Sequence, residues 1–240
     1  MAVYETALRR RETVAEGTMA FYFDKPAGFA HQAGQNALFT LVDPPETDAQ
    51  GPGRTFTIAS APHEPEIMIA TRMRYSAFKR VLKSAALGAP VRIDGPGGVM
   101  VLHEDAARPA VFLAGGIGVT PFLCMARHAA ANSLPHRIAL FYSNRRPEDA
   151  AFLEELRTLE RSNPNYRLVP TMSAAEKSSR PWQGETGFIR PDMLGRYLAD
   201  FRSPVYYFAG PPGMTMAMQS MLESLGVNAD DMRSEEFYGY

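Results

Sequence analysis

Short stretches rich in apolar and β-prone residues, separated by turn residues, fill the first hundred positions of the chain. Such stretches lie at residues 5–16, 18–23, 38–42, 54–60, 67–71 and 91–93. Clusters of Asp, Pro and Gly close two of them, at residues 24–28 and 94–98. Short strands at close spacing, with turn residues between them, predict an antiparallel barrel or sandwich.

One helical pattern interrupts this β-rich region, at residues 76–87. Its apolar residues, among them Val81 and Leu82, share one face, and lysines and arginines occupy the other. Ser76 is a typical N-cap residue, so the helix is expected to begin directly after it.

From about residue 109 the pattern changes to buried-strand runs that alternate with helical periodicity. Strands are expected at residues 110–114, 138–143, 166–172 and 205–210, and helices at 121–131, 148–161, 191–198 and 214–225. This alternation predicts a doubly wound α/β arrangement, a parallel sheet with helices on both faces. We therefore expect an N-terminal antiparallel β-barrel domain (residues 1–105) and a C-terminal α/β domain (residues 106–240), with residues 173–185 as a loop.

Composition and charge argue against several classes of function. The 240 residues carry a formal net charge of −1, and no basic excess supports binding to nucleic acid or to an anionic membrane surface. The long uncharged segments at residues 109–126 and 203–222 are interrupted by Gly and Pro, so no membrane insertion is expected. The single cysteine, Cys124, cannot form an intrachain disulfide or hold an iron–sulfur cluster. The five histidines lack metal-ligand spacing, and the N-terminus lacks a signal-peptide pattern, so we expect a cytoplasmic protein without a metal site.

A glycine-rich turn, Gly115 to Pro121, follows the first expected strand of the α/β region. Such a turn before a helix exposes backbone N–H groups that suit a phosphate or a polar cofactor. The ordinary dinucleotide fingerprint is G-x-G-x-x-G with an acidic residue at the end of the next strand. Here Pro121 replaces the third Gly, and the next strand ends in Ser-Asn-Arg-Arg at residues 143–146, without an acid. The turn is therefore a different kind of nucleotide loop, or an ordinary strand-to-helix connection.

Four motifs, in this order along the chain, resemble the ferredoxin–NADP⁺ reductase superfamily of flavoproteins. They are Arg-Thr-Phe-Thr at residues 54–57, Gly-Gly-Ile-Gly-Val-Thr-Pro at 115–121, Gly-Pro-Pro-Gly-Met at 210–214, and Glu-Glu-Phe at 235–237. The resemblance spans nearly the whole chain. It implies a barrel domain that binds FAD and an α/β domain that binds NAD(P)H.

The resemblance assigns the flavin to residues of the barrel. These are Arg54, Thr55, Phe56, Thr57, Ala70, Thr71, Arg72, Tyr75 and Ser76. By this resemblance Arg54 pairs with a flavin phosphate, Phe56 packs beside the flavin, and the Thr57 hydroxyl bonds near the flavin N5 atom. The helix that begins at Ser76 is expected to face the pyrophosphate, although Met73 stands where the family has a Gly.

The resemblance also assigns the nicotinamide nucleotide to the carboxyl ends of three strands. The residues are Gly115, Gly116, Ile117, Gly118, Thr120, Pro121, Ser143, Asn144, Arg145, Arg146, Gly210, Pro211, Pro212 and Met214. Arg145 and Arg146, with no acid beside them, favour NADPH over NADH. Several family members carry a Cys where this chain has Ala209, which puts the efficiency of hydride transfer or the choice of nucleotide in doubt.

The resemblance implies catalytic roles for Thr57, Thr120, Glu235 and Phe237. A carboxylate near the end of the chain lies by the nicotinamide or helps to deliver a proton in the family. An aromatic residue there shields the outer face of the flavin, and Phe237, Tyr238 and Tyr240 are the candidates.

The implied function is that of a flavoprotein oxidoreductase. It would pass a hydride from NAD(P)H to bound FAD and then electrons to a separate acceptor, such as ferredoxin, a flavodoxin-like protein or an oxygenase component. FAD rather than FMN is expected by the same resemblance, and a monomer is expected. The alternatives are an NAD(P)H-dependent reductase of free flavin or quinone, a non-catalytic electron-transfer subunit of a larger complex, and a nucleotide-binding module without flavin.

Overall fold

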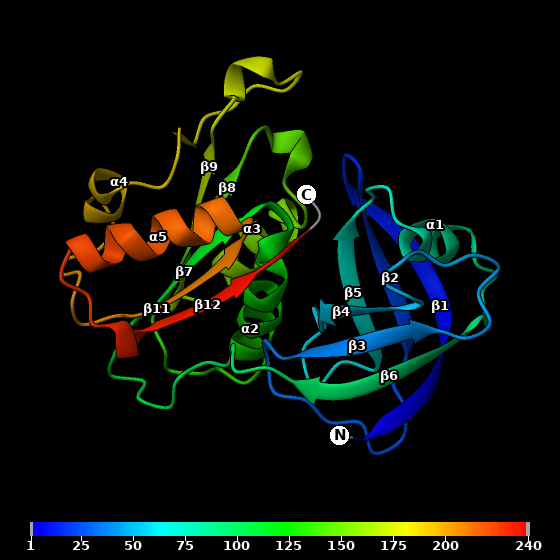
Figure 1. Cartoon of the computed structure of the whole chain (residues 1–240). Helices are drawn as coiled ribbons and strands as arrows, with labels where there is room; N and C mark the ends of the chain where they lie inside the picture. Colours follow the sequence, from blue (N-terminus) through cyan, green and yellow to red (C-terminus); the bar gives the residue numbers. More distant parts are fainter. Residues whose placement is uncertain (1, 239–240) are drawn as a thin grey trace.

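Two six-stranded sheets, one antiparallel and one parallel, lie side by side in the computed structural model, which describes residues 2–238 (Figure 1). The first sheet has the strand order β4-β3-β6-β1-β2-β5. Its strands are β1 (Val3–Ala15), β2 (Thr18–Asp24), β3 (Asn36–Leu41), β4 (Gly53–Thr57), β5 (Glu66–Arg72) and β6 (Pro90–Gly97). All of its strand pairs are antiparallel, and the sheet curls into an open barrel (Figure 1).

An aromatic and aliphatic core fills this barrel. Phe21, Phe23 and Phe39 are each at most 1% exposed, and they pack with Ile93 in one cluster. Helix α1 (Ala77–Ser84) covers the barrel, and its N-terminus is capped by Ser76, whose Oγ accepts from Lys79 N at 3.2 Å. The expected cap is therefore present.

The second sheet has the strand order β10-β9-β8-β7-β11-β12. Its strands are β7 (Ala110–Gly115), β8 (Ile138–Asn144), β9 (Tyr166–Met172), β10 (Glu185–Thr186), β11 (Val205–Gly210) and β12 (Met232–Glu236). All of its strand pairs are parallel, and every residue of β7 and β11 is buried. Uniform burial is expected of central strands whose two faces are both covered.

Helices cover both faces of the parallel sheet. They are α2 (Thr120–Ala131), α3 (Leu153–Ser162), α4 (Pro191–Gly195) and α5 (Pro212–Ser224). Two adjacent residues of β7 point to opposite faces of the sheet and show the two layers. Phe112 packs with Phe122 of α2, and Leu113 belongs to the cluster that includes Met218 of α5. The predicted fold class, an antiparallel barrel followed by a doubly wound α/β sheet, is confirmed.

Several predicted boundaries are wrong, for local reasons. The helix expected at residues 148–161 begins only at Leu153, because a 3-10 turn (Pro147–Asp149) and a left-handed Phe152 (φ 60°) precede it. Other errors concern length. The strand expected at 54–60 ends at Thr57, the helix expected at 76–87 ends at Ser84, the helix expected at 191–198 ends at Gly195, and the loop expected at 173–185 contains a 3-10 turn (Ala175–Lys177) and reaches β10.

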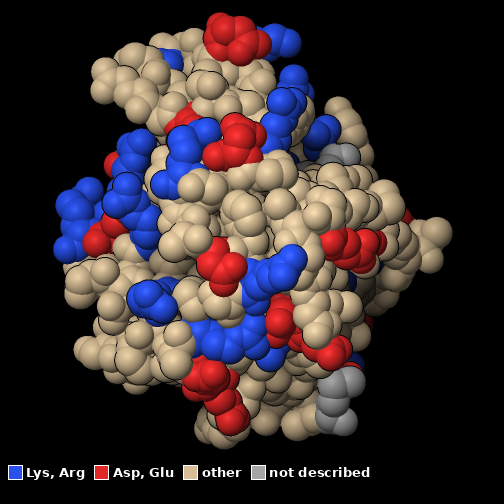
Figure 2. Space-filling model, turned by 90° about the vertical axis from the view of Figure 1, so that its left-hand side faces the viewer, with Lys and Arg blue, Asp and Glu red and all other residues tan. Residues whose placement is uncertain are grey.

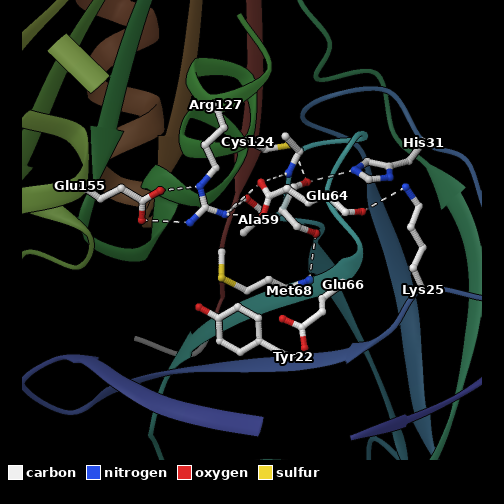
Figure 3. A network of polar contacts seen from close by, with 12 residues as sticks. Tyr22, Lys25, His31, Ala59, Glu64, Glu66, Met68, Cys124, Arg127 and Glu155 are labelled. Atoms are coloured by element: carbon white, nitrogen blue, oxygen red, sulfur yellow. Dashed lines mark hydrogen bonds and ion pairs between the residues drawn. The ribbon is translucent and has the colours of Figure 1, made fainter. Parts of the chain in front are cut away.

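A polar seam joins the two sheets (Figure 3). Arg127 of α2 binds the carboxylate of Glu155 on α3 through Nε (2.5 Å) and Nη2 (2.9 Å). Its Nη1 donates to the carbonyl of Ala59 at 3.3 Å and lies 3.4 Å from Glu64, both in the segment that follows β4. The Cys124 thiol donates to the Ser60 carbonyl at 3.0 Å. Helix α2 is thus tied to the segment that leaves β4.

Charge is evenly mixed on the side of the molecule turned away from the barrel. Figure 2 shows Lys and Arg side chains interspersed with Asp and Glu there, with no basic stripe of the kind that binds nucleic acid. Within residues 2–238, no helix has both the length and the apolar character needed to cross a membrane.

Candidate functional site

A cleft of about 580 Å³ lies between the two sheets, a volume typical of small-molecule sites. Strands β4 and β5, the start of α1, the turn after β7 and the end of β12 all contribute to it. The lining residues are Asp48, Ala49, Gln50, Arg54, Thr55, Phe56, Thr57, Ala70, Thr71, Arg72, Arg74, Tyr75, Ser76, Lys79, Ile117, Thr120, Glu235, Glu236, Phe237 and Tyr238.

Strand β4 supplies a cation, an aromatic ring and a hydroxyl to the cleft. The Arg54 guanidinium lies 5.8 Å from the ring centre of Phe78, and Phe56 packs against the same ring at 5.5 Å. This shared neighbour shows that residues 54 and 56 project to one side of the strand, as the alternation of a strand requires. The Thr57 hydroxyl is buried, and it finds no hydrogen-bond partner among the described residues. A buried hydroxyl without a partner is unfavourable, so a ligand that bonds to it would be stabilised.

Positive charge gathers at the end of the cleft beside α1. Arg54, Arg74 and Lys79 lie near one another there, and Arg72 lines the same cleft. Burial, and then the charges of Arg54 and Arg74, lower the pKa of Lys79. The buried Nε of Arg72 lacks a hydrogen-bond partner within residues 2–238. The three cations Arg54, Arg74 and Lys79, near the one carboxylate of Asp48, are suited to a polyanionic group such as a pyrophosphate.

The glycine turn after β7 lies in backbone contact with the end of β11. A Cβ atom on Gly118 would lie 2.2 Å from the carbonyl oxygen of Ala209 and 2.8 Å from Gly210 N. A Cβ atom on Gly115 would lie 2.2 Å from the Met214 sulfur. The two expected nucleotide motifs therefore meet, and Gly is required at residue 118 because backbone atoms, which cannot rotate away, would clash.

Two residues of this turn face the cleft directly, Ile117 and Thr120. The Thr120 hydroxyl donates to the Ile117 carbonyl at 3.1 Å, as a residue at a helix start often does. Thr120 is therefore both a helix-start residue and part of the cleft wall.

Glu235 is a half-buried carboxylate of the cleft. Its Oε1 accepts from Asn36 Nδ2 of β3 at 2.8 Å, and its Oε2 is buried with no partner in the described part of the chain. Burial raises the pKa of Glu235, and the hydrogen bond from Asn36 partly offsets that rise. A carboxyl with a raised pKa is suited to hold a proton near a reacting group. Phe237 lines the same wall, and its backbone N–H donates to the Gly210 carbonyl at 2.9 Å.

The structure brings most of the expected flavin residues together and leaves many expected nucleotide residues outside the cleft. All nine flavin candidates line it, as do Thr120, Glu235 and Phe237. The residues outside its wall are Gly115, Gly116, Gly118, Pro121, Ser143, Asn144, Arg145, Arg146, Gly210, Pro211, Pro212 and Met214. They lie at the carboxyl ends of β7, β8 and β11, where ligands of doubly wound sheets bind. Tyr240 lies outside the described residues.

Arg146 is already engaged by acidic side chains. It binds both carboxylate oxygens of Asp149, at 2.9 and 3.0 Å, and its Nη2 also lies 3.0 Å from Glu16 in the turn after β1. The hydrogen bonds from Arg146 lower the pKa of Asp149. The neighbouring Arg145 is exposed. The guanidinium of Arg146, which was expected to bind a 2′-phosphate, is therefore already bound to Asp149 and Glu16.

Sequence reasoning missed four residues of the cleft. Asp48, Ala49 and Gln50 lie in an acidic, Pro- and Gly-rich segment that reads as an ordinary loop, and Lys79 lies on the polar face of α1. A signal was available for Lys79, since it is one turn beyond the Ser76 cap, where a helix N-terminus faces an anion. Nothing in the sequence indicates that Asp48 turns inward.

Comparisons with known proteins agree with this geometry. Residues 112–220 match the oxidoreductase NAD-binding domain family. The chain is 26% identical over 230 residues to the glycine betaine monooxygenase reductase subunit of Chromohalobacter salexigens, covering 95% of this chain and 61% of that protein. It is 27% identical over 218 residues to the reductase component of propane 2-monooxygenase from Rhodococcus jostii, covering 89% of this chain and 57% of that protein. The chain thus spans about three fifths of the length of these two relatives.

The fold is also that of a solved reductase. A ferredoxin NADP⁺ reductase from Neisseria gonorrhoeae with bound FAD and NADP superimposes with a TM-score of 0.79 at 18% identity, covering 98% of each chain. At this identity the likeness establishes the fold, and the residues of the cleft must be argued from their own chemistry.

Proposed function

We propose that this chain is a flavoprotein oxidoreductase of the ferredoxin–NADP⁺ reductase superfamily, and that it takes reducing equivalents from NAD(P)H through FAD to a separate redox protein. The names of its relatives, reductase components of monooxygenases, favour an oxygenase component as that acceptor. The one cysteine of these 240 residues cannot hold an iron–sulfur cluster, so the acceptor lies outside this segment.

The observation that carries the proposal is the pairing of an unsatisfied hydroxyl with a cation cluster in one cleft. The Thr57 hydroxyl and the Arg72 Nε are both buried without partners among residues 2–238. Phe56 and Ile117 give the same cleft apolar surface suited to a flat ring. These residues fit a ligand with an aromatic ring system at one end and phosphates at the other, as FAD has.

Specific residues would hold each part of the cofactor. Arg54, Arg74 and Lys79, with the first amides of α1, would hold the phosphates. Thr57 would hydrogen-bond the ring edge, and Phe56 would pack beside it. When bound, FAD would supply the exchange between two-electron chemistry at the nicotinamide and one-electron transfer to the acceptor.

The α/β half would position and shield the nicotinamide end. Gly118 lets the β7 turn approach the end of β11, which leaves Ile117 and Thr120 at the cleft wall. Glu235 would hold or release a proton beside the ring, because its burial raises its pKa. Phe237 would cover the outer face of the site and exclude water from it.

Absorbance spectroscopy of the purified protein tests the proposal. We expect a flavin spectrum that bleaches when NADH or NADPH is added without oxygen. Arg54→Ala should retain little flavin, while Arg80→Ala, an exposed cation on the outer side of α1, should retain the wild-type amount. A colourless protein that takes up no added FAD would contradict the proposed function.

A further inference from the structure

The carboxylate of Asp48 already occupies the anion-binding end of the cleft. One of its oxygens accepts from the Arg54 guanidinium and, at 3.0 Å, from Gln50 N. The other accepts from the backbone N–H of Ala77 at 3.0 Å, the first residue of α1. Asp48 thus satisfies the guanidinium and the helix N-terminus at once, the two groups that would otherwise receive a phosphate.

The segment that carries Asp48 is held in place from both ends. Glu46 forms a two-point ion pair with Arg80 on the outer side of α1, at 2.7 and 2.9 Å. Arg54 Nη1 donates to the carbonyls of Gly51 and Gly53, at 2.8 and 2.7 Å. These contacts fix the backbone on both sides of residue 48, so the carboxylate is presented to the site in a defined position.

The charge balance shows that this internal anion compensates the site only in part. Two further cations, Arg74 and Lys79, lie near Arg54, and Arg72 lines the same cleft. Burial lowers the pKa of Lys79, and the charges of Arg54 and Arg74 lower it further. A ligand with two or more negative charges would therefore be favoured over the single carboxylate.

We propose that Asp48 is an internal competitor of the cofactor phosphate, which must displace this carboxylate from Arg54 and from the N-terminus of α1 before a phosphorylated flavin binds. This inference rests on the proposed function, because it assumes that the cleft holds a flavin. It assigns to Asp48 a lowering of the affinity for phosphorylated flavins that riboflavin, which has no phosphate, does not experience.

Flavin titrations of the whole chain test this assignment. We would measure the quenching of flavin fluorescence with FAD, FMN and riboflavin, on flavin-free wild-type protein and on Asp48→Asn. We expect the variant to bind FAD and FMN about tenfold more tightly than the wild type, because an amide is a weaker competitor for Arg54 than a carboxylate. Riboflavin should bind both proteins equally.

Glu46→Gln is the matched control, since it loosens the same segment without removing the anion from the site. It should leave the affinity for FAD at the wild-type value. Unchanged FAD affinity in Asp48→Asn, an equal gain for riboflavin, or an equal gain in Glu46→Gln would each overturn the role of Asp48 while leaving the proposed function intact. Failure of every protein to bind any flavin would overturn the proposed function and this inference together.

Discussion

Asn36 and Glu235, 199 residues apart in the sequence, meet at 2.8 Å and join strand β3 of the barrel to strand β12 of the parallel sheet. The contact fixes a half-buried carboxylate of the cleft from the opposite half of the molecule. The position of Glu235 therefore depends on the packing of the two sheets together.

Glu235→Gln should change the pH dependence of stability. Burial raises the pKa of Glu235 above its ordinary value of 4.5, so its protonated form is favoured by folding. The contribution to stability is present below the unfolded-state pKa and is lost as the pH rises through the folded-state pKa. Gln does not titrate, so the variant should gain stability relative to the wild type as the pH rises above the ordinary pKa of a carboxyl group. Urea unfolding of the flavin-free proteins at a series of pH values measures the free energy of unfolding, and Glu236→Gln, which changes an exposed neighbour, is the control. If the difference in this free energy between Glu235→Gln and the wild type did not change with pH, the prediction would be contradicted.

Arg127→Ala should destabilise the protein by about 2–3 kcal/mol, because it leaves Glu155 and the Ala59 carbonyl without their partner in a largely buried seam. The Arg127 side chain is 15% exposed. Arg157→Ala removes an exposed pair, whose side chains are 39% and 79% exposed, and should cost less than about 0.5 kcal/mol. Denaturant midpoints of the two variants give the comparison. Equal losses would show that the seam contributes no more than a surface pair.

Gly118→Ala should be among the most damaging single substitutions in the parallel-sheet half. The new Cβ would lie 2.2 Å from the Ala209 carbonyl oxygen, and a main-chain shift of this kind costs about 3 kcal/mol or prevents folding. Gly213→Ala is the matched control, because no atom lies within 4 Å of its Cβ position and Ala favours the helix. Thermal unfolding should show a lower midpoint for Gly118→Ala and an unchanged or higher one for Gly213→Ala. A wild-type midpoint for the first variant would contradict the close backbone contact.

The occupied guanidinium of Arg146 predicts a preference for NADH. A 2′-phosphate at the end of β8 would meet the carboxylates of Asp149 and Glu16, and Arg146 is bound to both. Asp149→Asn should raise kcat/KM for NADPH relative to NADH by about fivefold, because it releases part of the guanidinium fork. Glu154→Gln, an exposed acid on the next helix, should leave the ratio unchanged. A wild-type enzyme that prefers NADPH would contradict the prediction.

The parts of the fold that the sequence predicted well are those set by local pattern. Strands β7, β9 and β11 were expected within one residue of their bounds. In β7 and β11 the reason is that uniformly buried strands leave an unbroken apolar run. The start of α3 was missed because Phe152 adopts a left-handed conformation that the surrounding structure imposes. Strand β10 has two residues, too few for any pattern to indicate it.

The site divides in the same way. Arg54, Thr57 and the Ser76 helix start follow from motif order, since strand alternation and helix capping are local properties. Asp48 could not be found from sequence, because its role depends on a loop that folds back over α1 and meets Arg54. The hydrogen bond from Arg146 to Glu16 could not be found from sequence either, because Glu16 lies 130 residues away in the chain.

The reactivity of the Cys124 thiol can report the separation of α2 from the barrel. Cys124 is the one thiol of the chain, it is fully buried, and it donates to the Ser60 carbonyl across the seam between the sheets. Burial raises the pKa of this thiol to about 12, so in the closed molecule it is protonated and shielded from maleimide reagents. The rate of labelling would therefore follow how often α2 separates from the barrel, without an introduced cysteine. Comparing the labelling rate with and without nucleotide would show whether the contact between α2 and the barrel opens more often during turnover.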